Sequence, residues 1–231
     1  MEGLALVTGA GNGIGRAISH RFVKDGARVL AVDIDDAALA ALAGELGDRV
    51  VTAHCDVTDE ASLEAVAATA QSLGGLTAAV ANAGRGTWSP VVDHTLDEWR
   101  AVLDLCLTGT FLTVKHAARV MHDGGSIVTI ASLNAIQPAE GMSAYCAAKA
   151  GVAMFTKVAA MELGHRRIRV NGIAPGLVQT QLTGGFFSIP GMVEEFVENT
   201  AVGRFAQPED IADAAAFLAG PESTFVSGTL M

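Results

Sequence analysis

Cationic charge is scarce in this chain of 231 residues, which has 15 lysines and arginines against 25 aspartates and glutamates. The resulting net charge of -10 at pH 7 would repel nucleic-acid phosphates and anionic membrane surfaces, so neither is an expected partner. No apolar run reaches the length of a membrane-spanning helix. The first residues, MEGLALVTG, carry no cationic segment, so we expect no signal peptide.

Cysteine is also scarce, with only Cys55, Cys106 and Cys146 in the chain. An odd number at wide spacing does not form a disulfide framework, so we expect a cytoplasmic location. The six histidines show no metal-ligand spacing, and we predict no metal site. Half of the residues are hydrophobic and 17% are charged, which indicates a globule. The length suits a single domain, residues 1–231, with a large core.

Short apolar runs alternate with helical segments along the chain. Strands are expected at residues 4–7, 27–32, 49–54, 76–81, 126–130 and 168–173, with helices between them. Thr58 is expected to open one helix, and a Thr95–Glu98 capping box opens another that runs to about Met121. This alternation predicts the fold class, which is α/β with a Rossmann-type, doubly wound parallel sheet.

The first strand leads into a glycine-rich loop, TGAGNGIG at residues 8–15, and then into a helix. That order is typical of a dinucleotide-binding loop, whereas a glycine motif alone is equally typical of an ordinary turn. Asp33 lies about 20 residues after the glycines of this loop. A carboxylate at that distance can bond the ribose 2′-hydroxyl of a dinucleotide and repels a 2′-phosphate. Asn12 and Ile34 supply no compensating cation, so NAD is favoured over NADP. A helix-capping role for Asp33 is less favoured, because Asp35 and Asp36 are better placed to cap the next helix.

Tyr145 is the only tyrosine, and Lys149 follows four residues later in a helical segment at 143–163. The two side chains therefore share one helix face. A nearby cation lowers the pKa of a tyrosine, which is about 10 in the free side chain, so such a pair can exchange a proton with an alcohol or carbonyl oxygen. Ser132 could hold the same oxygen. Taken singly, each of these residues is more typical of a solvated helix or a strand end.

Together these motifs resemble those of the classical short-chain dehydrogenase/reductase family, over essentially the whole chain. The motifs that carry the resemblance are TGAGNGIG (8–15), Asp33, DV (56–57), NAG (82–84), Ser132, YCAAK (145–149) and NGIAPGLVQT (171–180). The thirteen-residue step from Ser132 to Tyr145 is also the usual one in that family. The combination is specific, although no single motif is.

The resemblance implies three catalytic residues: Tyr145 as general acid/base, Lys149 as the group that binds the nicotinamide ribose and lowers the Tyr145 pKa, and Ser132 as the group that orients the substrate oxygen. Further residues are implied to bind the cofactor NAD, and these are Gly9, Asn12, Gly13, Ile14, Asp33, Asp56, Val57, Asn82, Pro175, Val178 and Thr180. The implied activity is an NAD-dependent oxidoreductase that transfers a hydride between nicotinamide and a small-molecule alcohol or ketone. A homo-oligomer is also expected by resemblance to the family, and we predict a tetramer.

Two features depart from the family pattern. Cys106 stands where the family has an asparagine that is thought to hold a water, and a thiol replaces an amide poorly. We interpret Cys106 as a buried, inert side chain. Its presence keeps open a second function, an NAD-binding protein with weak or no turnover. The chain also stops at Met231, within the expected last strand.

Residues 181–204 are expected to form a substrate lid, with hinges at Gly184, Gly185 and Gly191. If the apolar residues of this lid face the site, they favour a largely apolar secondary alcohol or ketone as the substrate. The alternative is that these residues pack on the core or on a neighbouring subunit. These residues are Phe186, Phe187, Ile189, Met192 and Phe196. Trp88, Leu133, Asn134 and Gln137 are added to the pocket on position alone. A 3-oxoacyl reductase ranks lower, because the HDGG segment at 122–125 offers little basic charge and Asp33 disfavours NADPH.

Overall fold

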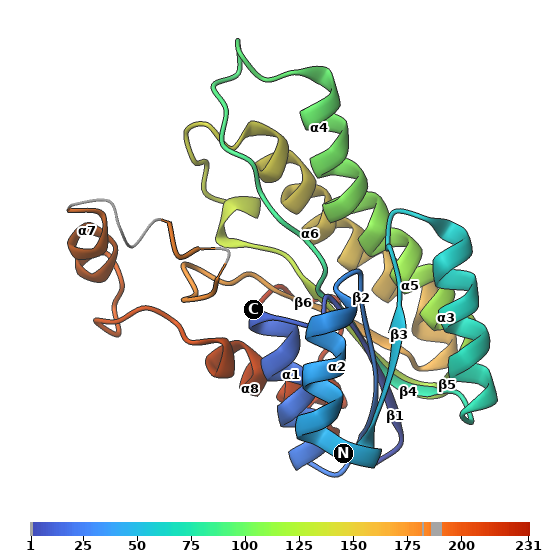
Figure 1. The fold of residues 1–231 in the computed structure, drawn as a ribbon. Coiled ribbons are helices and arrows are strands. Elements are labelled where there is room, and N and C mark those ends of the chain that lie inside the picture. The colour runs from blue at the N-terminus through green and yellow to red at the C-terminus, as the bar shows by residue number, and fades with distance from the viewer. Residues whose placement is uncertain (1, 182, 186–190) are drawn as a thin grey trace.

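Six parallel strands form one twisted sheet, in the order β3-β2-β1-β4-β5-β6, in a computed structural model that describes residues 2–181, 183–185 and 191–231 (Figure 1). The strands are β1 (Leu4–Thr8), β2 (Arg28–Asp33), β3 (Val50–His54), β4 (Leu76–Ala81), β5 (Met121–Ile130) and β6 (Arg169–Ile173). The predicted Rossmann-type sheet is therefore confirmed. The strand order reverses between β1 and β4, and in such sheets the crevice at this point is where ligands bind.

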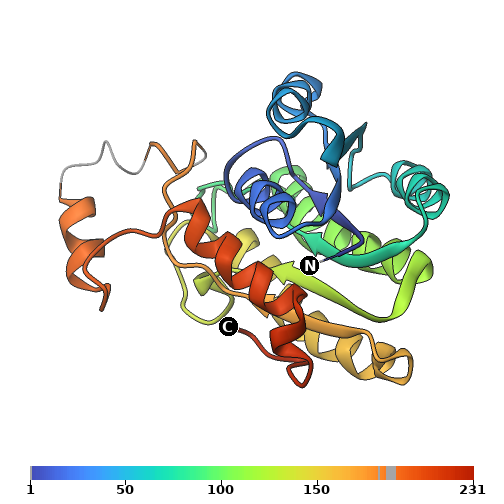
Figure 2. The same cartoon turned by 90° about the horizontal axis from the view of Figure 1, so that it is seen from below.

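Helices cover both faces of the sheet, as Figure 2 shows. The cluster on one face includes side chains from α1 (Gly13–Lys24), α2 (Asp36–Leu46) and α8 (Pro208–Ala219). The other cluster includes side chains from α3 (Glu60–Ser72), α5 (Gly109–Val120) and α6 (Ser143–Leu163). Alternate strand residues point to opposite faces, so each strand contributes to both clusters.

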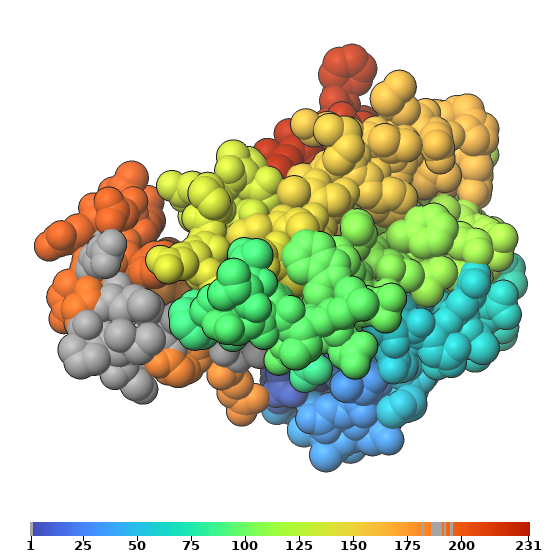
Figure 3. All heavy atoms as spheres, turned by 90° about the horizontal axis from the view of Figure 1, so that it is seen from above, coloured from blue at the N-terminus to red at the C-terminus, as the bar shows by residue number. Residues whose placement is uncertain are grey.

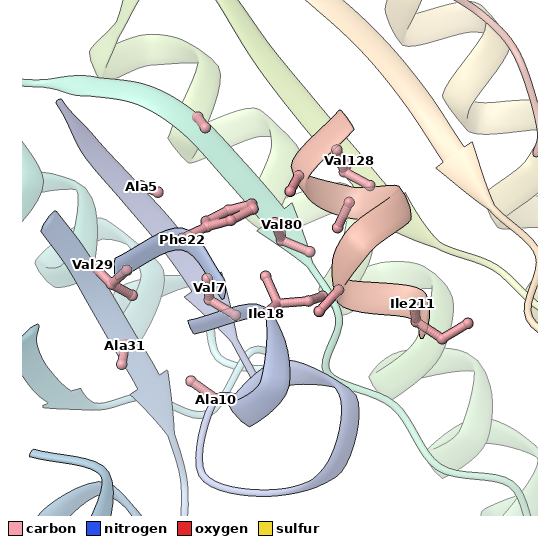
Figure 4. Packing of buried hydrophobic residues seen from close by; sticks show 14 of the residues in the cluster. Ala5, Val7, Ala10, Ile18, Phe22, Val29, Ala31, Val80, Val128 and Ile211 are labelled. Carbon is pink, nitrogen blue, oxygen red and sulfur yellow. The ribbon is translucent and has the colours of Figure 1, made fainter. Parts of the chain in front are cut away.

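The core under α1 shows this packing at close range. Ile18 and Phe22 lie over Val7 and Val80 of the sheet, and Ile211 of α8 belongs to the same cluster (Figure 4). Phe22 is fully buried, which stabilises the fold by about 2–3 kcal/mol relative to an exposed side chain. The N-terminal half of α1 is thereby fixed above the carboxyl end of β1.

Three expected boundaries need correction. Thr58 does not open the helix after β3: Asp59 caps α3 by accepting hydrogen bonds from the N–H groups of Ala61 and Ser62, while Thr58 donates to the Asp56 carboxylate. The capping box at Thr95 is confirmed, but its helix is not continuous. The helical segment that follows the capping box comprises α4 (Leu96–Leu103), a π-helical turn at Asp104–Thr108, and α5. The strand expected to begin at Ser126 begins at Met121.

The end of the chain lies along β6 without forming a regular strand. Leu230 makes an isolated parallel bridge with Gly172, and the N–H of Met231 donates to the Gly172 carbonyl. In Figures 1 and 2, α7 (Met192–Glu198) lies apart from the two helix layers. None of the described helices is long and apolar enough to cross a membrane.

Candidate active site

The glycine-rich loop turns sharply between β1 and α1, and its glycines are required by backbone conformation or by close packing. Gly9 and Gly13 have φ values of 63° and 51°, a region that favours glycine. A Cβ at Gly15 would lie 2.1 Å from the carbonyl oxygen of Gly9, so only glycine fits there. Asn12 precedes α1 without a side-chain cap, which leaves the N–H groups of the first turn available to an anion.

Asp33 holds this loop from the adjacent strand end. Its Oδ2 accepts a hydrogen bond of 2.9 Å from the N–H of Gly11, and its Oδ1 accepts one of 3.1 Å from the N–H of Asp35. Asp35, in turn, caps α2 by accepting from the N–H of Ala38. Asp33 is therefore not the helix cap, and its half-buried carboxylate lies beside the glycine loop.

Asn82 ties the end of β4 to the same loop. Its side-chain amide donates to the carbonyl oxygens of Thr8 at 2.9 Å and Gly9 at 3.2 Å. The hydroxyl of Thr8 accepts from the N–H groups of Asn82 and Ala83. The Asn82 amide thus has a structural role, in addition to any contact with an adenosine ribose.

Ser132, Tyr145 and Lys149 come together from two elements. Ser132 follows β5 and is buried, while the other two side chains lie on α6. Lys149 is 3% exposed, donates a hydrogen bond of 2.7 Å to the Ile130 carbonyl, and lies 5.6 Å from the centre of the Tyr145 ring. The spacing of four residues on one helix therefore places a cation close to the phenol, as the sequence predicted.

The titration of this pair differs from the expectation. Burial raises the pKa of Tyr145 to about 12, and the hydrogen bond with Ser132 opposes that rise. Burial also lowers the pKa of Lys149. The expectation that Lys149 lowers the Tyr145 pKa is thus not met in the protein alone, because desolvation of the phenolate is the largest effect. Tyr145 is held as a neutral phenol, the form that can give a proton to a carbonyl oxygen.

One cleft, with a volume of about 400 Å³, contains every residue that the sequence predicted for catalysis or cofactor binding. The residues it adds are Ile34, Cys55, Ala83, Gly84, Arg85, Leu105, Ile130, Ala131, Gly176, Gln181 and Thr183. Most of these directly precede or follow a predicted residue in the chain. Thr183 is less obvious: its hydroxyl donates to the Val178 carbonyl at 2.6 Å and accepts from the N–H of Thr180 at 2.9 Å.

Comparison with known proteins gives the same picture of the whole chain. A family model described as "Enoyl-(Acyl carrier protein) reductase" matches residues 9–231. D-threitol dehydrogenase of Mycolicibacterium smegmatis is 40% identical over 97% of this chain and 88% of its own length. The chain belongs to the classical short-chain dehydrogenase/reductase family. Members of this family are nicotinamide-dependent oxidoreductases, so the dinucleotide that the glycine loop and Asp33 fit is a nicotinamide one.

Other relatives extend this family assignment. Cis-4-hydroxycyclohexanecarboxylate dehydrogenase of Sinomonas cyclohexanicum is 38% identical over 100% of this chain and 94% of its own. The 3-alpha-(or 20-beta)-hydroxysteroid dehydrogenase of Mycobacterium bovis is 37% identical over 97% of this chain and 85% of its own length. The crystal structure of levodione reductase superposes with a TM-score of 0.92 at 32% identity, over 99% of this chain and 94% of the other.

Cys106 of this short-chain dehydrogenase/reductase lies in the π-helical turn and is fully buried. Its Sγ donates to the Arg85 carbonyl oxygen at 3.2 Å, and the Thr110 hydroxyl donates to the Cys106 carbonyl at 2.8 Å. A Cβ at Gly84 would lie 3.3 Å from the Cys106 sulfur and 3.4 Å from Nζ of Lys149. The thiol is therefore close to the ammonium group, yet it is bonded to the backbone. Its inertness stays a prediction.

The residues predicted for the substrate pocket on position alone do not line the cleft. Trp88 packs against Gly141, where a Cβ would lie 2.2 Å from the indole nitrogen. Asn134 bonds Ser132 and the Gln137 carbonyl, and Leu133 is 39% exposed. Of the apolar lid residues, Phe196 on α7 is 38% exposed, Phe186, Phe187 and Ile189 lie outside the described residues, and so does the side chain of Met192.

One group of possible metal ligands was not recognisable from the spacing of residues in the sequence. Glu60 and Glu64 of α3 lie with His116 of α5, and their ligand atoms are all within 4.8 Å of one another. Glu60 and Glu64 are four residues apart, but His116 lies 52 residues after Glu64, so the three do not form a recognisable motif in the sequence. The Glu60 carboxylate already bonds the buried His116, at 3.0 Å, and Lys115, and these bonds keep its pKa below the usual range. The Lys115 ammonium group is thus already paired with one member of the group.

Proposed function

We propose that this protein is an NAD-dependent short-chain alcohol dehydrogenase, or ketoreductase, that acts on a largely apolar secondary alcohol or ketone. The observation that carries the proposal is the single cleft in which Ser132, Tyr145 and Lys149 meet the glycine loop and Asp33. The first three residues supply acid/base chemistry and the others fit an adenine dinucleotide with a free 2′-hydroxyl.

The residues divide the chemistry between them. Tyr145 gives its proton to the carbonyl oxygen in reduction and takes one from the hydroxyl in oxidation. Ser132, whose hydroxyl lowers the pKa of Tyr145 and lies in the same cleft, holds the same oxygen. Lys149 lies next to the phenol, and its bond to the Ile130 carbonyl fixes the position of its Nζ. The bound nicotinamide supplies or accepts the hydride.

The choice of substrate rests on the lining of the cleft and on the relatives. Leu105, Ile130 and Ala131 give the cleft an apolar component. The relatives are named for different alcohols, including a threitol, a hydroxysteroid and a hydroxycyclohexanecarboxylate. We therefore place the substrate among free secondary alcohols or ketones, without an acyl carrier.

The test is a screen of secondary alcohols with NAD, in which the absorbance of NADH reports turnover. The set includes cyclohexanol, cis- and trans-4-hydroxycyclohexanecarboxylate, a 3-hydroxysteroid and threitol. A 3-oxoacyl thioester with NADPH serves as the competing activity and is expected to react more slowly. Turnover of no alcohol, or of the thioester alone, contradicts the proposal.

The second candidate function, an NAD-binding protein with weak or no turnover, is favoured only by Cys106. The same screen on Cys106→Asn separates the two. Because the thiol bonds only the Arg85 carbonyl, we expect turnover to stay equal or to rise with Asn, and to change by less than about threefold with Cys106→Ala. If alcohols react only after Cys106 becomes Asn, the NAD-binding function is the better one.

We also propose a homo-oligomer, in this family a tetramer, that buries the outer faces of α5 and α6. Phe111, Met154, Val158 and Met161 are 42%, 60%, 43% and 83% exposed there. A depression beside Phe111 is lined by charges of both signs, Arg119, Glu162 and Arg166 among them, so the surface can pair with a copy of itself. Light scattering should give the mass of a tetramer for the wild type. Val158→Asp should lower this mass, whereas Val92→Asp, in a distant loop, should leave it unchanged. A monomeric wild type contradicts this proposal.

A further inference from the structure

The lining of the cleft includes four charged side chains, Asp33, Asp56, Arg85 and Lys149. Three of them already have hydrogen-bonding partners. Asp33 accepts from Gly11, Asp56 accepts from Thr58, and Lys149 donates to Ile130. In contrast, no described residue forms a hydrogen bond or ion pair with the guanidinium of Arg85, which is exposed in the cleft.

The backbone places Arg85 at the Tyr145 end of the cleft. Its neighbour Gly84 lies against Cys106 and Lys149, and a Cβ on its other neighbour, Gly86, would lie 3.3 Å from the Tyr145 ring. The Arg85 carbonyl itself accepts the hydrogen bond of the Cys106 thiol. In Figure 3 the segment that follows Arg85, in green, lies next to the N-terminal part of α6, in yellow. The glycine loop, in contrast, contacts the chain before Arg85, at Asn82.

From this arrangement we infer that Arg85 binds a carboxylate of the substrate, so that the protein selects hydroxy acids or oxo acids over neutral alcohols of the same size. The inference rests on the proposed alcohol dehydrogenase function and names its substrate class. A guanidinium presents a planar fork of donors that fits a carboxylate with two parallel hydrogen bonds. A single unpaired cation balances a monoanion, whereas a phosphate monoester carries nearly two charges.

The negative net charge of the protein makes the positive charge of Arg85 important for binding an anionic substrate. With a net charge of -10, the chain as a whole repels an anionic substrate. An anion that reaches Ser132 and Tyr145 therefore needs a nearby positive charge, and Lys149 is buried and bonded to the backbone. Arg85 is the exposed cation among the described residues of the cleft. The other possible source of an anion there is the pyrophosphate of the cofactor, and the experiment distinguishes the two.

The experiment compares a carboxylate with its amide, which has the same shape and no charge. Rates with NAD are measured for 4-hydroxycyclohexanecarboxylate and 4-hydroxycyclohexanecarboxamide, in wild type, Arg85→Gln, Arg85→Lys and Arg100→Gln. Arg100 is a matched control, because it is exposed on α4, has no hydrogen-bonded or ionic side-chain partner among the described residues, and does not line the cleft. Melting curves verify that each variant is folded.

Arg85→Gln should lower kcat/KM for the acid about ten- to hundredfold, mainly through KM, because a charge-assisted pair is lost. It should leave kcat/KM for the amide and the NADH affinity within about twofold. Arg85→Lys should restore part of the activity on the acid, and Arg100→Gln should change nothing. An equal loss on acid and amide, or a loss of NADH affinity with the acid-to-amide ratio unchanged, overturns the inference and assigns Arg85 to the cofactor or the fold.

A binding measurement tests Arg85 even if neither alcohol reacts. Cyclohexanecarboxylate and cyclohexanecarboxamide lack the hydroxyl group and can be titrated into the enzyme–NADH complex, with NADH fluorescence as the readout. Tighter binding of the carboxylate in wild type, and its loss in Arg85→Gln, supports the carboxylate site whatever becomes of the dehydrogenase proposal. Equal binding of acid and amide in wild type overturns the site alone.

Discussion

Tyr145→Phe is expected to lower turnover of the best substrate by about 10²- to 10⁴-fold, the range typical of a lost general acid/base. The phenylalanine keeps the ring that packs against Gly86 and removes only the hydroxyl that Ser132 contacts. NADH affinity and melting temperature should therefore stay close to those of the wild type. Steady-state kinetics and NADH fluorescence on the same samples measure all three quantities. A folded Tyr145→Phe variant that keeps more than about a tenth of the turnover contradicts the acid/base role.

The pH dependence gives this prediction a direction. Burial raises the pKa of Tyr145 to about 12, so the phenol is mostly protonated near neutral pH in the protein alone. Reduction uses the protonated form and should not need alkaline conditions. Oxidation uses the phenolate, whose fraction grows as pH rises, so the oxidation rate should rise with pH. Tyr145→Phe should flatten this rise in the residual rate, whereas a structural role of Tyr145 would lower the rate equally at each pH.

Much of the fold and of this site follows from sequence patterns that act locally. Short apolar runs predict parallel strands, and the carboxyl ends of such strands meet at one edge of the sheet. Residues at or just after the carboxyl ends of strands, such as Asp33, Asn82 and Ser132, therefore gather there. The Tyr145–Lys149 pair needs only helix geometry, because four residues return the chain to the same face.

The features that the sequence did not predict depend on three-dimensional surroundings. The Tyr145 pKa is governed by burial, which the spacing to Lys149 does not report. The π-helical turn around Cys106 interrupts an apolar pattern that is otherwise that of one long helix. The free guanidinium of Arg85 becomes apparent only when the partners of the other cleft charges are known. Glu60 and His116 meet across 56 residues of chain.

Asp33 should set the cofactor preference. The wild type is expected to bind NADH more tightly than NADPH, because the Asp33 carboxylate lies beside the glycine loop, bonded to Gly11, where it can accept from a ribose 2′-hydroxyl and repels a 2′-phosphate. Asp33→Ala should weaken NADH binding about ten- to hundredfold, which is the usual cost of losing a hydrogen bond to a charged group. It should also reduce the difference between the affinities for NADH and NADPH. Fluorescence titration of both dinucleotides on one protein sample measures this.

Two further variants separate the charge of Asp33 from its hydrogen bonds. Asp33→Asn keeps an oxygen that can accept from the N–H of Gly11, so it should preserve the loop while it removes the repulsion of a 2′-phosphate. NADPH affinity should therefore rise more than NADH affinity falls. Asp36→Ala removes an equal charge from the first turn of α2, outside the cleft, and should leave both affinities within about twofold because exposed charges are strongly screened. Equal or tighter NADPH binding by the wild type, or an Asp36→Ala effect as large as that of Asp33→Ala, would mean that Asp33 does not select the cofactor.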